Sequence, residues 1–238
     1  MKPLIPKQHG AWAMLIIPFW LGVSAGQFRI GHIPMFIGWF FLYIGIYAVL
    51  MLIKGKKTNY FLKWTIIYLS AAIIFLIYPV INSVHLLLFA LLFTPFFMIS
   101  AYYSRKNKDR VLWNDLSAIA VFSLAGIAAY FYGTGMVDEH AAFIFITTYL
   151  FFTGCTFYVK TMIRERKNIR YKYISWFYHA LILIIWAVIG EWWVFAAFLP
   201  SFIRAVGFYG RPLTIKQVGI FEIINAALFF ILMIPAVR

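Results

Sequence analysis

The sequence predicts an all-α fold, a polytopic membrane bundle of helices, and three observations lead to it. Hydrophobic residues make up 64% of the chain and charged residues only 12%, whereas roughly a quarter of a soluble domain is charged. The apolar residues are gathered in runs of about 20, the length of a helix that crosses a bilayer. The basic residues, which give a net charge of +14, are confined to short segments between those runs.

Nine apolar runs are present, and we expect each to form one transmembrane helix. The segments around Asn82-Ser83 and Gly190-Glu191-Trp192 are short, so the helices that they join are expected to be antiparallel neighbours. No change of composition marks a second domain, and residues 1–238 are expected to form one integral membrane domain. In order, the predicted helices are Ala11–Phe28, Pro34–Ile53, Leu62–Ile81, Val84–Tyr103, Asn114–Gly133, Ala141–Lys160, Ile174–Gly190, Trp193–Tyr209 and Lys216–Pro235.

The positions of the basic residues predict the orientation of the bundle. Six of them lie in the segment Lys160–Tyr173 between two apolar runs, and such a cluster stays on the cytoplasmic side of a membrane. With helices that alternate in direction, 19 of the 21 lysines and arginines are then cytoplasmic, and only Arg29 and Arg238 lie outside. We therefore predict a cytoplasmic N-terminus, an external C-terminus and a location in the bacterial cytoplasmic membrane.

The composition and the motifs also exclude several functions. Basic residues that are confined to short loops between apolar runs act as orientation signals, so no nucleic-acid partner is expected and the lipid bilayer is the expected surrounding. The single cysteine, Cys155, lies in an apolar run, which rules out an internal disulfide. No zinc, phosphate-loop or nucleophile-elbow motif is present, so we expect no metal and no cofactor, and no catalytic residue is assigned.

Aromatic and small residues are expected to serve the packing of the bundle. Indole rings favour the level of the lipid head groups, so we expect five tryptophans near helix ends at that level, namely Trp39, Trp64, Trp113, Trp192 and Trp193. Small residues allow helices to approach closely. We expect such contacts at Gly38, Gly45, Gly126, Gly154 and Gly219.

Ionisable and amide side chains inside the predicted helices require a reason, because they are costly in a bilayer. His179, Arg204 and Glu222 each lie one or two turns from the cytoplasmic end of their helix, and Asn225 shares a helix face with Glu222. One interpretation is an ion pair between Arg204 and Glu222, with His179 hydrogen-bonded nearby. The other is a polar cavity that opens to the cytoplasm, and both can hold together.

The cytoplasmic rim supplies the candidates for binding a ligand head group. Near the N-terminus, Gly10 would let another backbone approach, while His9 and Trp12 would either lie over a cavity mouth or anchor the helix at the interface. Asp115 lies at a predicted helix start, where a carboxylate interacts favourably with the helix dipole. The other candidates are Lys54, Asn59, Tyr103, Arg105, Arg110, Asn114, Arg164, Glu165 and Arg166.

The segment Lys7-Gln-His9-Gly-Ala-Trp12-Ala-Met-Leu-Ile-Ile-Pro18-Phe-Trp-Leu-Gly22 resembles the start of the YwiC-like family of bacterial membrane proteins. The resemblance extends over the chain, and its most specific part is His9-Gly-Ala-Trp12. A weaker resemblance is to the UbiA superfamily of intramembrane prenyltransferases, which have nine helices and a cytoplasmic N-terminus. Pro18 and Gly22 are similar to their Pro-x-x-x-Gly pattern, and Tyr103–Arg110 is similar to their Tyr-x-x-x-Lys-Arg loop.

The resemblance to the UbiA superfamily implies a lipid ligand but not the usual chemistry. Those enzymes hold Mg²⁺ and a diphosphate with aspartate-rich loops, whereas the corresponding loops here, Lys54–Asn59 and Arg164–Asn168, contain one acid. We therefore expect a UbiA-like protein that binds or modifies an isoprenoid-type or other anionic lipid; as an enzyme it would be a divergent prenyltransferase-like transferase. The alternatives are a small proton-linked transporter centred on His179, Arg204 and Glu222, and a non-catalytic partner of a respiratory membrane complex.

Overall fold

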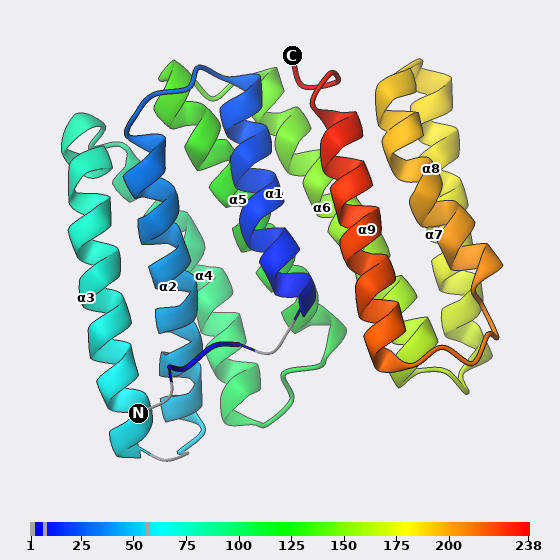
Figure 1. Ribbon diagram of the computed structural model, residues 1–238, viewed down its shortest axis with the longest axis horizontal. Helices are drawn as coiled ribbons and strands as arrows, with labels where there is room; N and C mark the ends of the chain where they lie inside the picture. The colour runs from blue at the N-terminus through cyan, green and yellow to red at the C-terminus, as the bar shows by residue number, and fades with distance from the viewer. Residues whose placement is uncertain (1–2, 7–8, 56–57) are drawn as a thin grey trace.

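The computed structural model of the chain is a bundle of helices (Figure 1). It describes residues 3–6, 9–55 and 58–238, with the side chain of His9 left out. In these residues there are nine α-helices, one short π-helix and no strand, which confirms the predicted all-α class and all nine helices. They are α1 (His9–Ala25), α2 (His32–Ile53), α3 (Thr58–Asn82), α4 (Leu86–Arg105), α5 (Leu112–Thr134), α6 (Glu139–Val159), the π-helix η1 (Lys160–Arg164), α7 (Ile169–Ile189), α8 (Trp192–Gly207) and α9 (Ile215–Met233).

Seven of these helices are long and apolar enough to cross a membrane: α2, α3, α4, α5, α6 with η1, α7 and α9. The other two, α1 and α8, are apolar but have only 17 and 16 residues. At 1.5 Å per residue, 16 residues extend about 24 Å, which is less than the hydrocarbon thickness of about 30 Å. The chain is therefore a polytopic helical bundle in which two of the nine predicted spans are short.

The helices alternate in direction, so the connections between them are sorted onto two ends (Figure 1). The start of α1 lies at one end together with the connections at residues 54–55, 106–111, 165–168 and 208–214; we call this the basic end. The opposite end carries residues 26–31, 83–85, 135–138, 190–191 and the end of the chain. The side of the membrane that each end faces remains a prediction.

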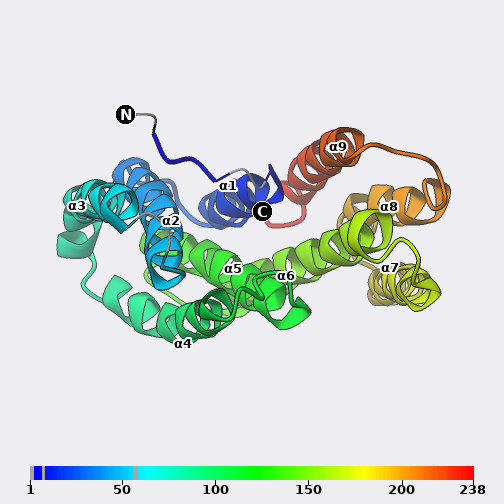
Figure 2. The ribbon, with the colours of Figure 1, turned by 90° about the horizontal axis from the view of Figure 1, so that it is seen from below.

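Helix α1 lies near the centre of the bundle, packed mainly against α5 and also against α6 and α9 (Figure 2). The bundle has two large apolar cores, and both contain residues of α1 and α5. One extends to α6, α7, α8 and α9, and the other extends to α2 and α4. Helix α3 packs mainly against α2, on the outer side of the bundle.

Glycines allow the two central helices to touch. A Cβ atom on Gly22 would lie 2.1 Å from the carbonyl oxygen of Gly126, and one on Gly126 would lie 2.6 Å from the carbonyl oxygen of Pro18. Both obstacles are backbone atoms, which cannot move aside as a side chain can. The backbones of α1 and α5 are therefore in direct contact at this crossing.

The other predicted glycine contacts are confirmed in all cases but one. An added Cβ would lie 2.5 Å from Leu76 at Gly38, 2.7 Å from Leu69 at Gly45 and 3.0 Å from His179 at Gly154. At Gly219 an added Cβ would meet no atom of the described residues within 4 Å, so the prediction of a close helix contact there was wrong. Gly219 lies in the second turn of α9, close to the basic end.

The predicted interfacial tryptophans differ in their surroundings. Trp113, Trp192 and Trp193 lie at helix starts and are exposed, as expected of rings at the head-group level. The prediction for Trp39 was wrong, because this ring is buried against Phe93 and Phe122, and its indole N–H donates to the carbonyl oxygen of Leu15 at 3.3 Å. Helix α2 begins at His32, which places Trp39 two turns inside the helix. Trp64 is half-buried and stacks on Tyr68.

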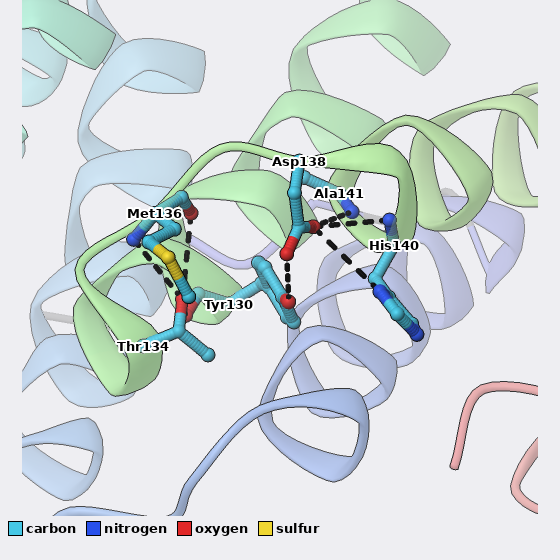
Figure 3. A network of polar contacts seen from close by, with 6 residues as sticks. All are labelled: Tyr130, Thr134, Met136, Asp138, His140 and Ala141. Carbon is cyan, nitrogen blue, oxygen red and sulfur yellow. Dashed lines mark hydrogen bonds and ion pairs between the residues drawn. The ribbon is translucent and has the colours of Figure 1, made fainter.

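A polar network closes the turn between α5 and α6 at the opposite end (Figure 3). One carboxylate oxygen of Asp138 accepts the N–H groups of His140 and Ala141 at 3.0 and 3.2 Å, so Asp138 caps the start of α6. The other oxygen accepts the hydroxyl of Tyr130, from the last turns of α5, at 2.8 Å. The hydrogen bond from Tyr130, and after it those from the backbone, hold the pKa of Asp138 below its usual value of 3.8.

Candidate functional site

Buried polar side chains from three helices meet between the middle of the bundle and its basic end. On each of α6, α8 and α9 two polar residues are three positions apart, which places them on one helix face. All three faces point toward one another, as the contacts below show. We call these six residues the polar cluster: Cys155, Tyr158, Ser201, Arg204, Glu222 and Asn225.

An ion pair between Arg204 and Glu222 forms the centre of the polar cluster. Nη1 of Arg204 donates to Oε1 of Glu222, and the side chains are only 5% and 12% exposed. The guanidinium carbon lies 4.0 Å from the ring centre of Tyr158, which gives a cation–π contact. Its Nη2 lies 3.9 Å from Sγ of Cys155, a weak hydrogen bond. The predicted ion pair between neighbouring helices is confirmed.

Asn225 of α9 contacts both α8 and α6. Its amide nitrogen donates to the hydroxyl oxygen of Ser201 at 2.9 Å and lies 3.9 Å from Sγ of Cys155. The sulfur atom is thus approached by two donors, from Arg204 on α8 and from Asn225 on α9. A small, weakly accepting side chain at position 155 lets both come close to α6.

His179 lies beside the polar cluster but is bonded within its own helix. Its Nδ1 lies 2.7 Å from the carbonyl oxygen of Ser175, and since a carbonyl only accepts, Nδ1 carries the proton. Nε2 is then an acceptor, and it faces Gly154, next to Cys155 on α6. Among the described residues Nε2 has no hydrogen-bond partner. The expected hydrogen bond of His179 therefore exists, but it does not reach the ion pair.

A second group of charges joins α5 to η1 at the basic end. Nζ of Lys160 lies 3.0 Å from the carboxylate of Asp115 and donates to the carbonyl oxygen of Arg110 at 2.9 Å. Arg164, one π-turn further, lies 3.6 Å from the same carboxylate. The lysine is 5% exposed although it is charged. Asp115 lies in the first turn of α5, as the dipole interpretation requires, but it also forms these two ion pairs.

The π-helix explains why this arrangement was not foreseen. Its widened turn is marked by the N–H of Glu165, which bonds to the carbonyl oxygen of Lys160, five residues back, at 2.7 Å. Such turns are rare and often lie at functional sites. Here the turn follows α6 directly and carries Lys160 and Arg164 to the same carboxylate.

The connection between α4 and α5 is tied to α2. Lys54, directly after α2, lies 2.5 Å from the carboxylate of Asp109. The side-chain amide of Asn114 donates to the backbone oxygen of Asp109 at 2.7 Å. Lys54 and Asn114 are thus engaged within the protein and are not free to bind a ligand in this arrangement.

The remaining head-group candidates lie on several different helices and connections at the basic end. Trp12 packs against Phe40 and Tyr43 of α2. A Cβ on Gly10 would meet no described atom within 4 Å, so the close backbone approach expected at Gly10 is not found among the described residues. The side chain of His9 lies outside the described part of the chain. The exposed candidates are Asn59, Arg105, Arg110, Arg164 and Arg166, while Tyr103 and Glu165 are half-buried.

The acids of the basic end are already occupied. Asp109 pairs with Lys54, Asp115 pairs with Lys160 and Arg164, and Glu165 accepts the side-chain amide of Asn168 at 3.3 Å. In the described residues several exposed cations at this end have no acidic partner. They include Arg105, Lys106, Lys108, Arg110, Arg166, Lys167, Arg170 and Arg211.

Lys172 has a contact that the sequence analysis did not foresee. Its ammonium lies 4.5 Å from the ring centre of Trp176 and 4.8 Å from that of Tyr209, and Trp176 also donates to the carbonyl oxygen of Ala205. This basic residue is therefore held by aromatic rings and adds little to a free cationic surface. The spacing of four between Lys172 and Trp176 was the available signal.

The comparisons with known proteins identify the family. Residues 5–130 match the family model described as YwiC-like protein. The chain belongs to the YwiC-like family. A relative from Bacillus subtilis (strain 168), named uncharacterized protein YwiC, is 44% identical over 233 residues, which cover 98% of each chain. An uncharacterized protein of Haemophilus influenzae is 39% identical over 236 residues, which cover 99% of each chain. No solved structure matches the chain.

Proposed function

We propose that this family member binds an anionic lipid, with the head group at the basic end and the apolar tail along the helices. The observation that carries the proposal is the surplus of cations at that end. The described acids there are paired or hydrogen-bonded, and at least Arg105, Arg110 and Arg166 are exposed without an acidic partner. An anionic head group would supply the missing negative charge.

The residue types suit a phosphate or a similar group. The planar guanidinium of an arginine binds two oxygens of a phosphate in parallel, and three of the proposed contacts are arginines. Arg164 is a fourth candidate, because it is 35% exposed and only loosely paired with Asp115 at 3.6 Å. Lys160 is a positioning residue, since its buried ammonium holds the carboxylate of Asp115 and the backbone of Arg110 in place.

The resemblance to the UbiA superfamily supports an isoprenoid-type lipid as the ligand. The loops that are aspartate-rich in those enzymes contain one acid here, Glu165, which is bonded to Asn168. No group of three or more His, Cys, Asp or Glu side chains is placed to hold a metal ion within the described residues. These features favour lipid binding, or a divergent transfer reaction, over the metal-dependent prenyl transfer of that superfamily.

The test is native mass spectrometry of the protein in detergent with polyprenyl phosphate, a quinone, phosphatidylglycerol and phosphatidylcholine. The variant Arg105→Gln/Arg166→Gln removes two cations from the basic end. The control Arg29→Gln/Arg238→Gln removes two exposed cations from the opposite end. At about 1 kcal/mol for each cation near an anionic lipid, the first variant should bind the anionic lipids about thirtyfold more weakly.

The control variant should bind these lipids as the native protein does. Equal binding by both variants would reject the head-group site at the basic end. Retention of a polyprenyl phosphate in preference to phosphatidylglycerol would assign the isoprenoid class, while equal retention of the two would leave a general site for anionic lipids.

A further inference from the structure

The ion pair in the polar cluster uses only part of the Arg204 guanidinium. Nη1 faces Glu222, but Nη2 has only the sulfur of Cys155 at 3.9 Å, and Nε has no hydrogen-bond partner in the described residues. Nε and Nη2 form the side edge of the guanidinium, whose two parallel N–H groups match two oxygens of a carboxylate or an oxoanion. The edge of the guanidinium that carries two parallel N–H groups therefore has no oxygen acceptor in the described residues.

Tyr158, whose ring packs on the guanidinium, carries a second unmatched donor. The hydroxyl of Tyr158 has no partner among the described residues, although the side chain is 1% exposed and its ring lies under the guanidinium. The amide nitrogen of Asn225 lies 3.9 Å from the same sulfur atom. Buried donors without acceptors are unfavourable, and an ion pair with a purely structural role would not require them. The arrangement is that of a site prepared for further oxygen acceptors.

From this geometry we infer that the polar cluster binds a small carboxylate or oxoanion on the side edge of Arg204, and that Glu222 takes up one proton with it. The charges of Arg204 and Glu222 cancel, so an anion alone would leave a net negative charge among buried groups, which is costly inside a membrane. A proton on Glu222 restores neutrality. The carboxyl is also the more exposed partner of the pair, at 12% against 5% for the guanidinium.

In the described part of the chain, few titratable groups lie near Glu222 that could take up the proton in its place. Arg204 faces it from α8, and behind the guanidinium lie Cys155 and Tyr158 of α6. Helix α1 also packs against α9, but its described side chains, from position 10 to 25, include no titratable group. His179 of α7 faces Gly154, the residue before Cys155 on α6. It is the alternative proton acceptor. The site shares no residue with the proposed lipid site.

The probe is formate, the smallest carboxylate, added to the full chain in detergent while chloride keeps the ionic strength constant. Binding is measured from the rise in the unfolding temperature between pH 5.5 and 8. Uptake of one proton with each anion predicts that the apparent Kd weakens about tenfold for each pH unit above the pKa of the acceptor. In Glu222→Gln the neutral amide replaces the protonated acid, so formate should bind without this pH dependence.

Three further variants complete the test. Tyr158→Phe keeps the ring under the guanidinium and should weaken formate several-fold, while Arg204→Lys removes the side edge and should abolish binding. Arg166→Gln at the basic end should leave formate binding as it is in the native protein, which separates this site from the lipid site. The inference is overturned if formate stabilises the native protein no more than chloride does. It is also overturned if Glu222→Gln keeps the pH dependence, or if His179→Gln alone removes it.

Discussion

The backbones of Gly22 and Gly126 are in contact where α1 crosses α5, and a Cβ on Gly22 would lie 2.1 Å from the carbonyl oxygen of Gly126. Only glycine permits this approach, because any other residue would push the two helices apart. The contact lies where the two large apolar cores share α1 and α5, so a displacement here would disturb both of them.

Gly22→Ala is expected to destabilise the protein by about 1–3 kcal/mol or more, the usual cost of forcing extra atoms into a packed core. The control is Gly219→Ala, since an added Cβ there meets no atom of the described part of the chain within 4 Å, and alanine is favoured over glycine in a helix by about 0.5–1 kcal/mol. Unfolding of the two variants in detergent, followed by tryptophan fluorescence, gives the comparison. A loss of stability in Gly219→Ala equal to that in Gly22→Ala would contradict the structure.

Lys160→Met should lower the free energy of unfolding by about 1–3 kcal/mol, because the half-buried carboxylate of Asp115 loses its ion-pair partner and the carbonyl oxygen of Arg110 loses its donor. Methionine fills a similar volume, so the loss reports the polar contacts. Lys167→Met is the matched control: this lysine is exposed, and its replacement should change stability little. Chemical unfolding in mixed detergent measures both, and equal values would show that the ammonium of Lys160 is not engaged as described.

Stability should depend on pH through Asp138. The pKa of Asp138 in the folded state lies below the unfolded value of 3.8. The contribution of this carboxylate to the free energy of unfolding is therefore complete above pH 3.8, and it is lost as the pH falls through the lower, folded-state pKa. Asp138→Asn should therefore unfold at a lower temperature than the native protein at pH 7, and the difference should shrink below pH 4. Tyr130→Phe removes the largest cause of the shift and should reduce the pH dependence. A difference that stays constant from pH 3 to pH 7 would argue against this network.

The orientation of the bundle is testable because the chain has a single cysteine, which is buried. In a Cys155→Ser background, Val137→Cys introduces a thiol at the opposite end and Lys167→Cys one at the basic end, both at exposed positions. A membrane-impermeant maleimide should label Val137→Cys in intact cells and Lys167→Cys only after permeabilisation. The reverse pattern would place the basic end outside the cell.

The helices were predictable because the local sequence indicates each one, as an apolar run bounded by charges or by glycine and asparagine. Helix ends differed by a few residues. Helix α5, for example, starts at Leu112 and not at Asn114, and the side chain of Val111 before it makes no capping hydrogen bond. The π-helix gave no local signal, since its i→i+5 turn depends on the contact of Lys160 and Arg164 with Asp115 on another helix.

The polar cluster was only partly predictable, because it too depends on contacts between helices that are distant in the sequence. Glu222 and Asn225 drew attention because charged and amide groups are conspicuous in an apolar run, and the pairing of Glu222 with Arg204 followed from charge. Cys155 and Tyr158 were missed, although they repeat the same spacing of three on α6. Their role depends on which helices become neighbours, and α6, α8 and α9 meet through tertiary packing that no short segment encodes.

The packing of α1 has a consequence for how the chain is made. The ribosome makes α1 before its main partner, α5, which follows only after three other helices, and before another neighbour, α9, which follows after seven. Gly22 of α1 therefore has no Gly126 to pack against until α5 has been made. The centre of the bundle can be completed only once α9 has been made as well.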